Sequence, residues 1–198
     1  MAAGNGNKSE LFGAILGRIS GLSKEDGRAF ADLSAEQVFA RDEAFLRAGG
    51  DSDLFALVGS GIFRALYMTH DGKRVIRRFY RQSDLMGSFA MALVRQPAHV
   101  TIEALEPSKA FVFKYSAFAA LREQRPAWEK ASRVLLETNY VLRETRAYQL
   151  LAFDATERLR LFREEYADVC DRIPKGDVAS YLGINPVTLS RILHPKGA

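Results

Sequence analysis

The sequence has 198 residues, of which 47% are hydrophobic and 26% charged, so one large domain or two small ones with a packed core can form. The formal net charge of +4 mildly favours an anionic partner such as nucleic acid. A single cysteine, Cys170, excludes an intramolecular disulfide or a thiolate metal cluster. The opening residues MAAGNGNKSE lack a secretory signal pattern, and no apolar run reaches the about 18 residues that span a bilayer. We therefore expect a cytoplasmic protein without membrane contact.

The first part of the chain predicts a tail and two short helices. Residues 1–10 are small and polar, which is typical of a flexible tail. Apolar residues recur at Leu11, Ile15 and Ile19, and this spacing predicts a short helix. A second short helix is expected over residues 24–33.

Between about Glu36 and Lys114 the pattern changes to short apolar and aromatic runs separated by turn residues, which is typical of strands. Strands are expected at 38–40, 45–46, 54–58, 62–69, 75–80, 100–104 and 110–114. Asp71-Gly72 predicts a tight hairpin of type I′, in which both central residues have positive φ. About eight strands at this spacing indicate a small antiparallel barrel, roll or sandwich.

A long helix is predicted after the strands. Pro126 suits the first turn of a helix, and residues 128–153 contain neither Gly nor Pro. Such a helix is roughly 40 Å long, which is more than a small domain needs for its own packing. The seven-residue spacing of Val134, Val141 and Tyr148 favours a dimer seam of the coiled-coil type, although a helix buried within a monomer remains an alternative. The residues assigned to the dimer interface are Val134, Leu135, Val141, Leu142 and Tyr148.

A further helix is expected to begin at Asp154, where Asp154 and Glu157 have the spacing of a capping box. Its apolar face is formed by Leu159, Phe162, Tyr166 and Val169. The junction between the two helices, at Phe153-Asp154, is a predicted hinge between domains.

The most specific pattern is KGDVASYLGINPVTLSRIL at residues 175–193, which predicts a helix-turn-helix. A small residue, Ala179, stands where the two helices would touch, and Gly183 supplies the turn. Asn185 can cap the second helix, with Pro186 in its first turn. Apolar residues occupy the positions between the helices, namely Val178, Leu182, Ile184, Leu189 and Ile192.

In a helix-turn-helix the second helix enters the major groove of DNA, with its N-terminal half toward the base edges. Arg191 could bond a guanine or a phosphate, Thr188 a base or a phosphate, and Val187 could contact a thymine methyl. Phosphate contacts are expected from Lys175, His194 and Lys196. The candidate DNA-binding residues are Lys175, Asn185, Val187, Thr188, Ser190, Arg191, His194 and Lys196. A helix-turn-helix used only for packing is the alternative.

The predicted order of elements resembles the Crp/Fnr family of bacterial transcription regulators from about Leu11 to Leu193. The resemblance is carried by LRAGGDSDLFALVGSGIFRALY, HDGKRVIRRFYRQSDLMGSF and, most specifically, IPKGDVASYLGINPVTLSRI. It implies an α+β fold with an effector-type β-roll resembling cyclic-nucleotide-binding domains, a dimerisation helix and a winged-helix-like DNA-binding domain. It also implies a homodimer on a two-fold related site in double-stranded DNA, with RNA polymerase as a further partner. The expected boundaries are 1–10 for the tail, 11–125 for the roll, 126–153 for the dimerisation helix and 154–198 for the helix-turn-helix domain.

The expected effector site departs from the cyclic-AMP pattern of this family. Family members that bind cyclic AMP carry Gly-Glu-Leu-Ala, whose Glu accepts the ribose hydroxyl, and an Arg-Ser or Arg-Thr about ten residues later that holds the phosphate. Here Ser88 replaces the Glu, and Ala98 and His99 stand where Arg-Ser would be. The tentative effector pocket comprises Gly87, Ser88, Phe89, Arg95, Ala98 and His99. We expect no cyclic-AMP binding; another small-molecule effector, or none, stays open, and this stretch looks similar to a branch of the family with a degenerate pocket.

Other chemistries of the family find no support in the residues. An iron–sulfur sensor needs about four cysteines, and neither His70 nor His99 lies in a haem motif. The sequence ends shortly after the second predicted helix, so the β-hairpin wing of many family members is expected to be missing. No nucleophile elbow, phosphate loop or metal-spaced cluster suggests an enzyme, and Glu103 and Glu106 are expected to be solvated.

The function predicted from the sequence is therefore a sequence-specific, homodimeric, DNA-binding transcription regulator that does not respond to cyclic AMP. The alternative is a ligand- or protein-binding β-roll whose helix-turn-helix is vestigial.

Overall fold

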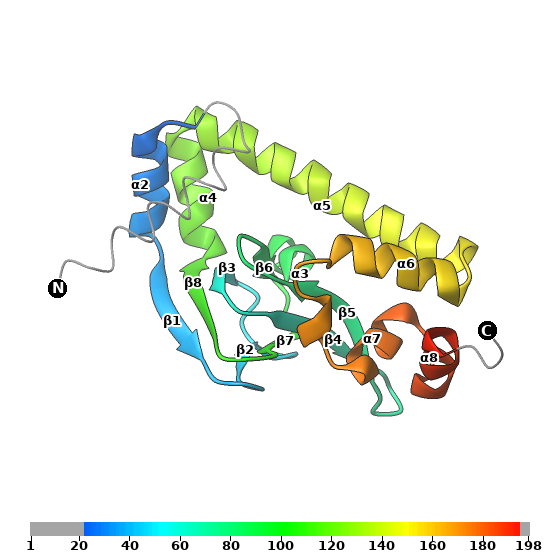
Figure 1. The fold of residues 1–198 in the computed structure, drawn as a ribbon. Coiled ribbons are helices and arrows are strands. Elements are labelled where there is room, and N and C mark those ends of the chain that lie inside the picture. Colours follow the sequence, from blue (N-terminus) through cyan, green and yellow to red (C-terminus); the bar gives the residue numbers. More distant parts are fainter. Residues whose placement is uncertain (1–21, 195–198) are drawn as a thin grey trace.

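The structure, a computed structural model, describes residues 22–194. The predicted tail, the first predicted helix and Lys196 lie outside the described residues. Figure 1 shows a β-roll with α5 running along one side and a cluster of short helices at the C-terminal end. The expected α+β fold with a roll, a long helix and a helix-turn-helix is confirmed.

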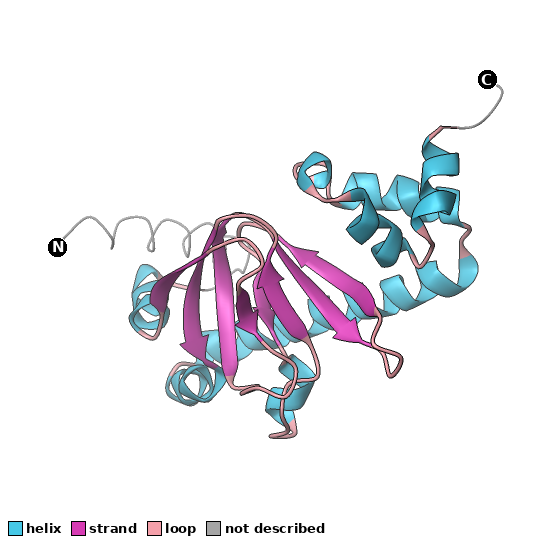
Figure 2. Ribbon diagram, turned by 90° about the horizontal axis from the view of Figure 1, so that it is seen from below, coloured by secondary structure: helices cyan, strands magenta, loops and turns pink. Residues whose placement is uncertain are grey.

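Within residues 22–194, eight strands form two antiparallel sheets of four strands each, which face one another (Figure 2). The first sheet has the order β1 (Ala35–Phe39), β8 (Ser108–Lys114), β3 (Leu54–Ser60) and β6 (Leu85–Gly87). The second has the order β2 (Ala44–Leu46), β7 (Thr101–Ala104), β4 (Phe63–Met68) and β5 (Arg74–Tyr80).

The helices surround this roll and make up the C-terminal part. Beside the roll lie α2 (Lys24–Asp32), α3 (Phe89–Leu93), α4 (Tyr115–Gln124) and α5 (Pro126–Ala152). The C-terminal helices are α6 (Ala155–Glu165), α7 (Lys175–Leu182) and α8 (Pro186–Leu193), with a short 3₁₀ turn at Cys170–Arg172.

Strands at the centre of the first sheet are apolar on both faces, because each face is covered. In β3, Ala56 and Val58 point into the roll, whereas Phe55 and Leu57 point outward to the helices. This burial on two sides explains why these strands read as continuous apolar runs rather than as an alternating pattern.

Three apolar clusters follow from this arrangement. The interior of the roll is filled by side chains of both sheets, among them Phe39, Phe63 and Met86. Outside the first sheet, Phe30 of α2 packs with Trp128 of α5, and the indole nitrogen of Trp128 donates to the backbone oxygen of Asp26. The third cluster joins the outer face of the second sheet to the C-terminal helices.

The hairpin between β4 and β5 differs from the expected type I′ turn. Gly72 has a φ of +78°, but Asp71 does not have a positive φ. The loop is longer than two residues: the amide of Thr69 donates to the oxygen of Lys73, and the amide of Gly72 donates to the oxygen of Thr69. Only one residue in the left-handed region is needed in such a loop, and glycine supplies it.

Helix boundaries were predicted well where a cap fixes them. The side chain of Asp154 accepts a hydrogen bond of 2.8 Å from the amide of Glu157, so the N-cap of α6 is confirmed. The reciprocal half of the predicted capping box is wrong, because the Glu157 carboxylate pairs with Arg160 instead. The short strand β6 was not predicted, since three residues are too few to show a period.

Candidate nucleic-acid interface

The predicted helix-turn-helix is formed by α7 and α8. Gly183 ends α7 in the left-handed conformation, with a φ of +69°. Its amide donates to the oxygen of Ser180, and the amide of Ile184 donates to the oxygen of Ala179, the pair of bonds that makes a Schellman motif. The sharp turn lets the next helix begin within two residues.

The start of α8 is fixed by its own side chains. Asn185 accepts a hydrogen bond of 2.7 Å from the amide of Thr188, and Pro186 occupies the first turn. Between the helices, Ala179, Leu182 and Leu189 are buried, which is the packing that the sequence predicts. These side chains belong to the apolar cluster that the C-terminal helices share with the second sheet.

The outer face of α8 is free of contacts with the roll. Val187 is 60% exposed, although it is apolar. Arg191 is exposed and forms no hydrogen bond or ion pair with any described residue. Asn185, Ser190 and His194 are also exposed, and Thr188 is half-buried. Five of the predicted contact residues therefore lie on one accessible surface, and Thr188 lies at its edge.

Lys175 lies apart from these residues, at the exposed beginning of α7. A basic side chain at this end suits the phosphate contacts expected of it, because such contacts set position rather than sequence.

The helix-turn-helix is docked on the roll of its own chain through α7 and not through the outer face of α8. The backbone amide of Ile76 in β5 donates to the Ser180 hydroxyl at 3.0 Å. Ile76 and Phe79 pack in the same apolar cluster as Tyr181. The surface expected to face DNA stays open in this docked arrangement.

An arginine of the roll completes the docking. The Arg64 guanidinium in β4 bonds Asp177 of α7 at 2.7 Å, Glu103 of β7 at 2.7 Å and Asp42 at 2.7 Å. The Arg64 side chain is 11% exposed and that of Glu103 12%. Burial lowers the pKa of Arg64, but its bonds to Asp177 and Glu103 outweigh this effect and hold the guanidinium charged.

The prediction that Glu103 and Glu106 are solvated is wrong. Glu103 also pairs with Arg74, and Glu106 pairs with Arg172 in the 3₁₀ turn of the C-terminal part. Sequence reasoning missed these pairs because their partners are distant in the chain. No local spacing signals them.

The outward face of α5 carries an apolar row. Val141 and Tyr148 are each 59% exposed, and Val134 is also exposed. Five further large apolar side chains are exposed on this helix, namely Leu136, Tyr140, Leu142, Leu150 and Leu151. Large apolar groups in a continuous row on a helix are typical of an interface.

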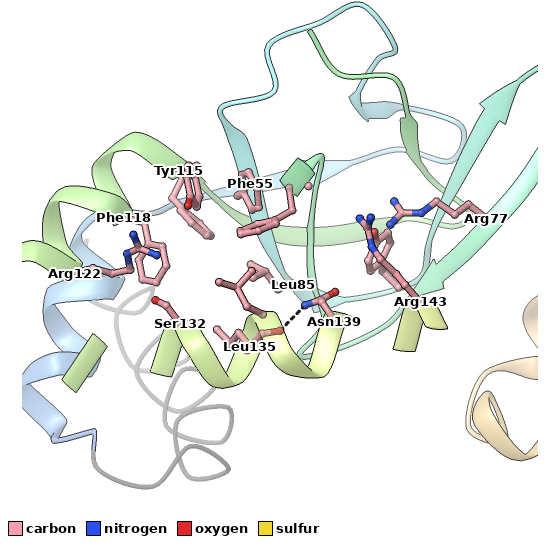
Figure 3. A pocket seen from close by; sticks show the side chains of 15 residues that line it. Phe55, Arg77, Leu85, Tyr115, Phe118, Arg122, Ser132, Leu135, Asn139 and Arg143 are labelled. Atoms are coloured by element: carbon pink, nitrogen blue, oxygen red, sulfur yellow. Dashed lines mark hydrogen bonds between the residues drawn. The ribbon is translucent and has the colours of Figure 1, made fainter. Parts of the chain in front are cut away.

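Two residues of the predicted dimer interface have other surroundings. Leu135 is half-buried and packs with the cluster under the first sheet. It lines a cavity with Phe118 and Leu85 (Figure 3). Leu142 is partly exposed and borders a second cleft. Of the five residues assigned to the dimer interface, four are thus exposed, namely Val134, Val141, Leu142 and Tyr148, with Leu142 at 41% and Val134 at 39%, whereas Leu135 is half-buried against the roll.

The residues of the tentative effector pocket do not converge on one cavity. Ser88 is buried at the start of α3, and Ala98 is buried inside the roll. Gly87 and Phe89 line the cavity under α5, whereas Arg95 borders a shallow groove on another side. His99 is exposed and stacks on Tyr67, with ring centroids 5.5 Å apart.

Two of the cavities that α5 lines are also lined by strands of the roll. One, of about 50 Å³, is lined mostly by aromatic and aliphatic side chains of the roll, α4 and α5 (Figure 3). The other, of about 370 Å³, lies where β5, α5, α6 and α7 meet, and Tyr181 is part of its wall. Burial, and then the nearby Glu165, raise the pKa of Tyr181 to about 12. Its phenol is therefore neutral at physiological pH.

Residues 22–194 contain no group of three or more His, Cys, Asp or Glu side chains placed to hold a metal ion. In the same range no helix has both the length and the hydropathy of a membrane span.

Known proteins share this fold. Residues 36–125 match the cyclic nucleotide-binding domain family. No curated protein matches the sequence. Among solved structures, FixK2 from Bradyrhizobium japonicum is 24% identical with a TM-score of 0.68, and the alignment covers 81% of this chain and 82% of that one. A putative transcriptional regulator of the Crp/Fnr family from Eubacterium rectale is 17% identical with a TM-score of 0.69, covering 87% and 82%.

The global regulator CLP from Xanthomonas campestris, described as responsive to c-di-GMP, is 14% identical with a TM-score of 0.66, covering 86% of this chain and 90% of that one. All three alignments extend beyond the roll. Residues 36–125 are thus similar to the cyclic nucleotide-binding domain family, and the chain as a whole has the fold of the solved Crp/Fnr family regulators.

Proposed function

We propose that this protein is a sequence-specific DNA-binding transcription regulator that acts as a homodimer and does not respond to cyclic AMP. The observation that carries the proposal is the outer face of α8. Its helix is held from behind by a buried core, while Val187, Ser190 and Arg191 are exposed in front. A supported helix with an open polar and basic face has the geometry of a recognition helix.

The chemistry of this face suits base recognition rather than phosphate binding alone. Arg191, which has no ion pair among the described residues, can donate two parallel hydrogen bonds to a guanine. Val187 offers an apolar surface for a thymine methyl. Lys175 supplies charge at the beginning of α7, apart from the outer face of α8. In this proposal Arg191 and Val187 recognise bases, and Lys175 positions the protein on the phosphate backbone.

A dimer is proposed because one short helix reads too few base pairs for useful specificity. The exposed row of Val134, Val141 and Tyr148 repeats every seven residues along α5, as in a two-stranded coiled coil. Pairing of two α5 helices would bury this row and bring two copies of α8 to one double helix. A two-fold related DNA site follows from such symmetry.

The described residues do not fit cyclic AMP. A cyclic phosphate needs a cationic partner and the ribose a carboxylate, yet the corresponding positions hold Ala98 and Ser88, both buried. The interior of the roll is filled by Phe39, Phe63 and Met86 instead. We expect that cyclic AMP leaves both the melting temperature and the DNA affinity unchanged.

The proposal is tested by selecting bound fragments from sheared genomic DNA with the purified protein. Wild-type protein is expected to enrich a limited set of fragments. Arg191→Ala is expected to bind the most enriched fragment at least about tenfold more weakly, the effect of losing one bidentate base contact. Arg163→Ala, which removes an exposed arginine of α6, is the matched control and should bind like wild type. Equal binding by both variants would refute the assignment of α8.

The alternative, a roll that binds a ligand or protein beside a vestigial helix-turn-helix, predicts no enrichment. It also predicts no steep loss of DNA binding when salt is raised, because phosphate-driven association releases counterions and weakens with salt.

A further inference from the structure

The outer face of α8 carries one apolar side chain in a row of polar ones. Val187, Ser190, Arg191 and His194 stand at positions i, i+3, i+4 and i+7, so they lie along one side of the helix. All four are exposed, and Val187 is exposed at 60%. An apolar group is thus presented beside an arginine on the face that we assign to base recognition.

The packing of α8 does not account for this valine. The buried side of the helix consists of Leu189, with Ile192 and Leu193 partly buried, and Val187 is not part of their cluster. A β-branched residue also stabilises a helix less than alanine does. Single exposed apolar residues such as Val38 are common on protein surfaces. What distinguishes Val187 is that Arg191 lies one helical turn away on the same face.

The valine is held rigidly at the start of the helix. The Asn185 side chain caps α8 through the amide of Thr188, and Pro186 occupies the first turn. A valine in a helix has one strongly preferred rotamer, so its two methyl groups keep one position relative to the backbone. An apolar contact made by this side chain therefore loses little conformational entropy on binding.

The same face is poor in groups that would favour cytosine. In the major groove cytosine presents an amino donor, for which a carboxylate is the usual partner, whereas thymine presents a 5-methyl group. The helix α8 contains no Asp or Glu. The side-chain oxygen of Asn185 is engaged by the amide of Thr188. The chemistry next to Arg191 thus favours a methyl group over an amino group.

We propose that Val187 recognises the 5-methyl group of a pyrimidine, thymine or 5-methylcytosine, within two base pairs of a guanine bound by Arg191. This inference rests on the proposed function. The Cβ atoms of residues i and i+4 in a helix are about 5–6 Å apart, which is less than two base-pair steps of about 3.4 Å. Uracil and unmethylated cytosine lack the methyl group. Methylation of a cytosine at this position therefore strengthens binding of the regulator.

The test uses the DNA fragment that wild-type protein enriches most strongly. Each thymine in the protected region is replaced in turn by deoxyuridine, which removes only the 5-methyl group, and fluorescence anisotropy gives the dissociation constant. One thymine in each half-site should be sensitive, with binding about fourfold weaker for each half-site substituted, the factor expected for burial of one carbon group.

Two variants assign this effect to the valine. Val187→Ala removes both methyl groups of an exposed side chain and should bind the thymine and uracil duplexes almost equally. Val38→Ala makes the same change at an exposed valine of β1 and should keep the preference of wild type for thymine. Circular dichroism checks that each variant folds.

The guanine is located by 7-deazaguanine, which lacks the N7 acceptor of a bidentate arginine contact. This substitution should weaken binding by wild type but not by R191A. The guanine found in this way should lie within two base pairs of the thymine that Val187 recognises.

A cytosine series tests the methyl group on a second base. Exchange of the sensitive thymine–adenine pair for cytosine–guanine should weaken binding. Exchange for 5-methylcytosine–guanine should bind about fourfold more tightly than the cytosine duplex for each half-site.

The outcomes separate this inference from the proposed function. If no fragment is enriched, both fail. If a fragment is enriched but no thymine is sensitive to uracil, only the methyl recognition is overturned. It is also overturned if V187A keeps the full preference for thymine, if the guanine lies farther than two base pairs away, or if cytosine and 5-methylcytosine duplexes bind equally.

Discussion

At the scale of single residues, the best predicted features are those fixed by local backbone chemistry. Gly183 and Asn185 were assigned from sequence, and the left-handed φ of one and the capping bond of the other are as expected. The type I′ turn predicted at Asp71-Gly72 was wrong, because several turn types place a glycine in the left-handed region and the sequence does not distinguish among them.

Gly183 provides a direct test at this scale. Gly183→Ala places a Cβ on a backbone with a φ of +69°, 3.4 Å from the Leu150 side chain. The left-handed conformation should lower the free energy of unfolding by about 1–2 kcal/mol. Gly176→Ala is the matched control, since its added Cβ meets no atom within 4 Å in a helix, where Ala is favoured. Urea denaturation measures both, and equal stability of the two variants would contradict the turn geometry.

At the scale of elements, the long helix was predicted as a whole, but the role of each of its faces was only partly predicted. A seven-residue spacing identifies the row of Val134, Val141 and Tyr148. It does not show that Leu135 packs against the cluster beneath the first sheet. The reason is physical: both faces of α5 are apolar, so hydrophobic pattern alone cannot say which face meets the roll.

The proposed dimer face is tested by V141E/Y148E. Two carboxylates in a buried apolar seam would repel one another and lose hydration, so sedimentation velocity should show a monomer where wild type is a dimer. V38E/M68E introduces the same change at two exposed apolar side chains of the roll and should leave the dimer intact. A dimer that survives V141E/Y148E would place the interface elsewhere.

At the scale of the whole molecule, the docking of the helix-turn-helix on the roll could not be predicted from the sequence. Arg64 meets Asp177 across 113 positions of the chain, and Ile76 meets Ser180 across 104. Such contacts exist only once both parts are folded and placed.

The ion pair between Arg64 of β4 and Asp177 of α7 is expected to hold the helix-turn-helix on the roll. Asp177→Asn removes the charge that reaches across from α7 and leaves Glu103 and Asp42 on Arg64. Loss of this charge-assisted bond should weaken docking by about 1–3 kcal/mol. The Ile76 amide donates to the Ser180 hydroxyl, so its hydrogen exchange reports how often α7 separates from the roll. This exchange should become faster in Asp177→Asn.

The matched control for this experiment is Asp171→Asn, which makes the same change of charge at an exposed residue of the 3₁₀ turn. It should leave the exchange of the Ile76 amide unchanged. Unaltered exchange in both variants would mean that the apolar contacts of α7 alone hold the docked arrangement.

The most direct test of the account is a hydroxyl-radical footprint of the wild-type protein on its most enriched DNA fragment. Two copies of α8 on a symmetric pair of subunits should protect two half-sites whose centres are about one helical turn, or 10–10.5 base pairs, apart, with two-fold related sequences. Protection of a single half-site, or of DNA without any two-fold relation, would contradict it.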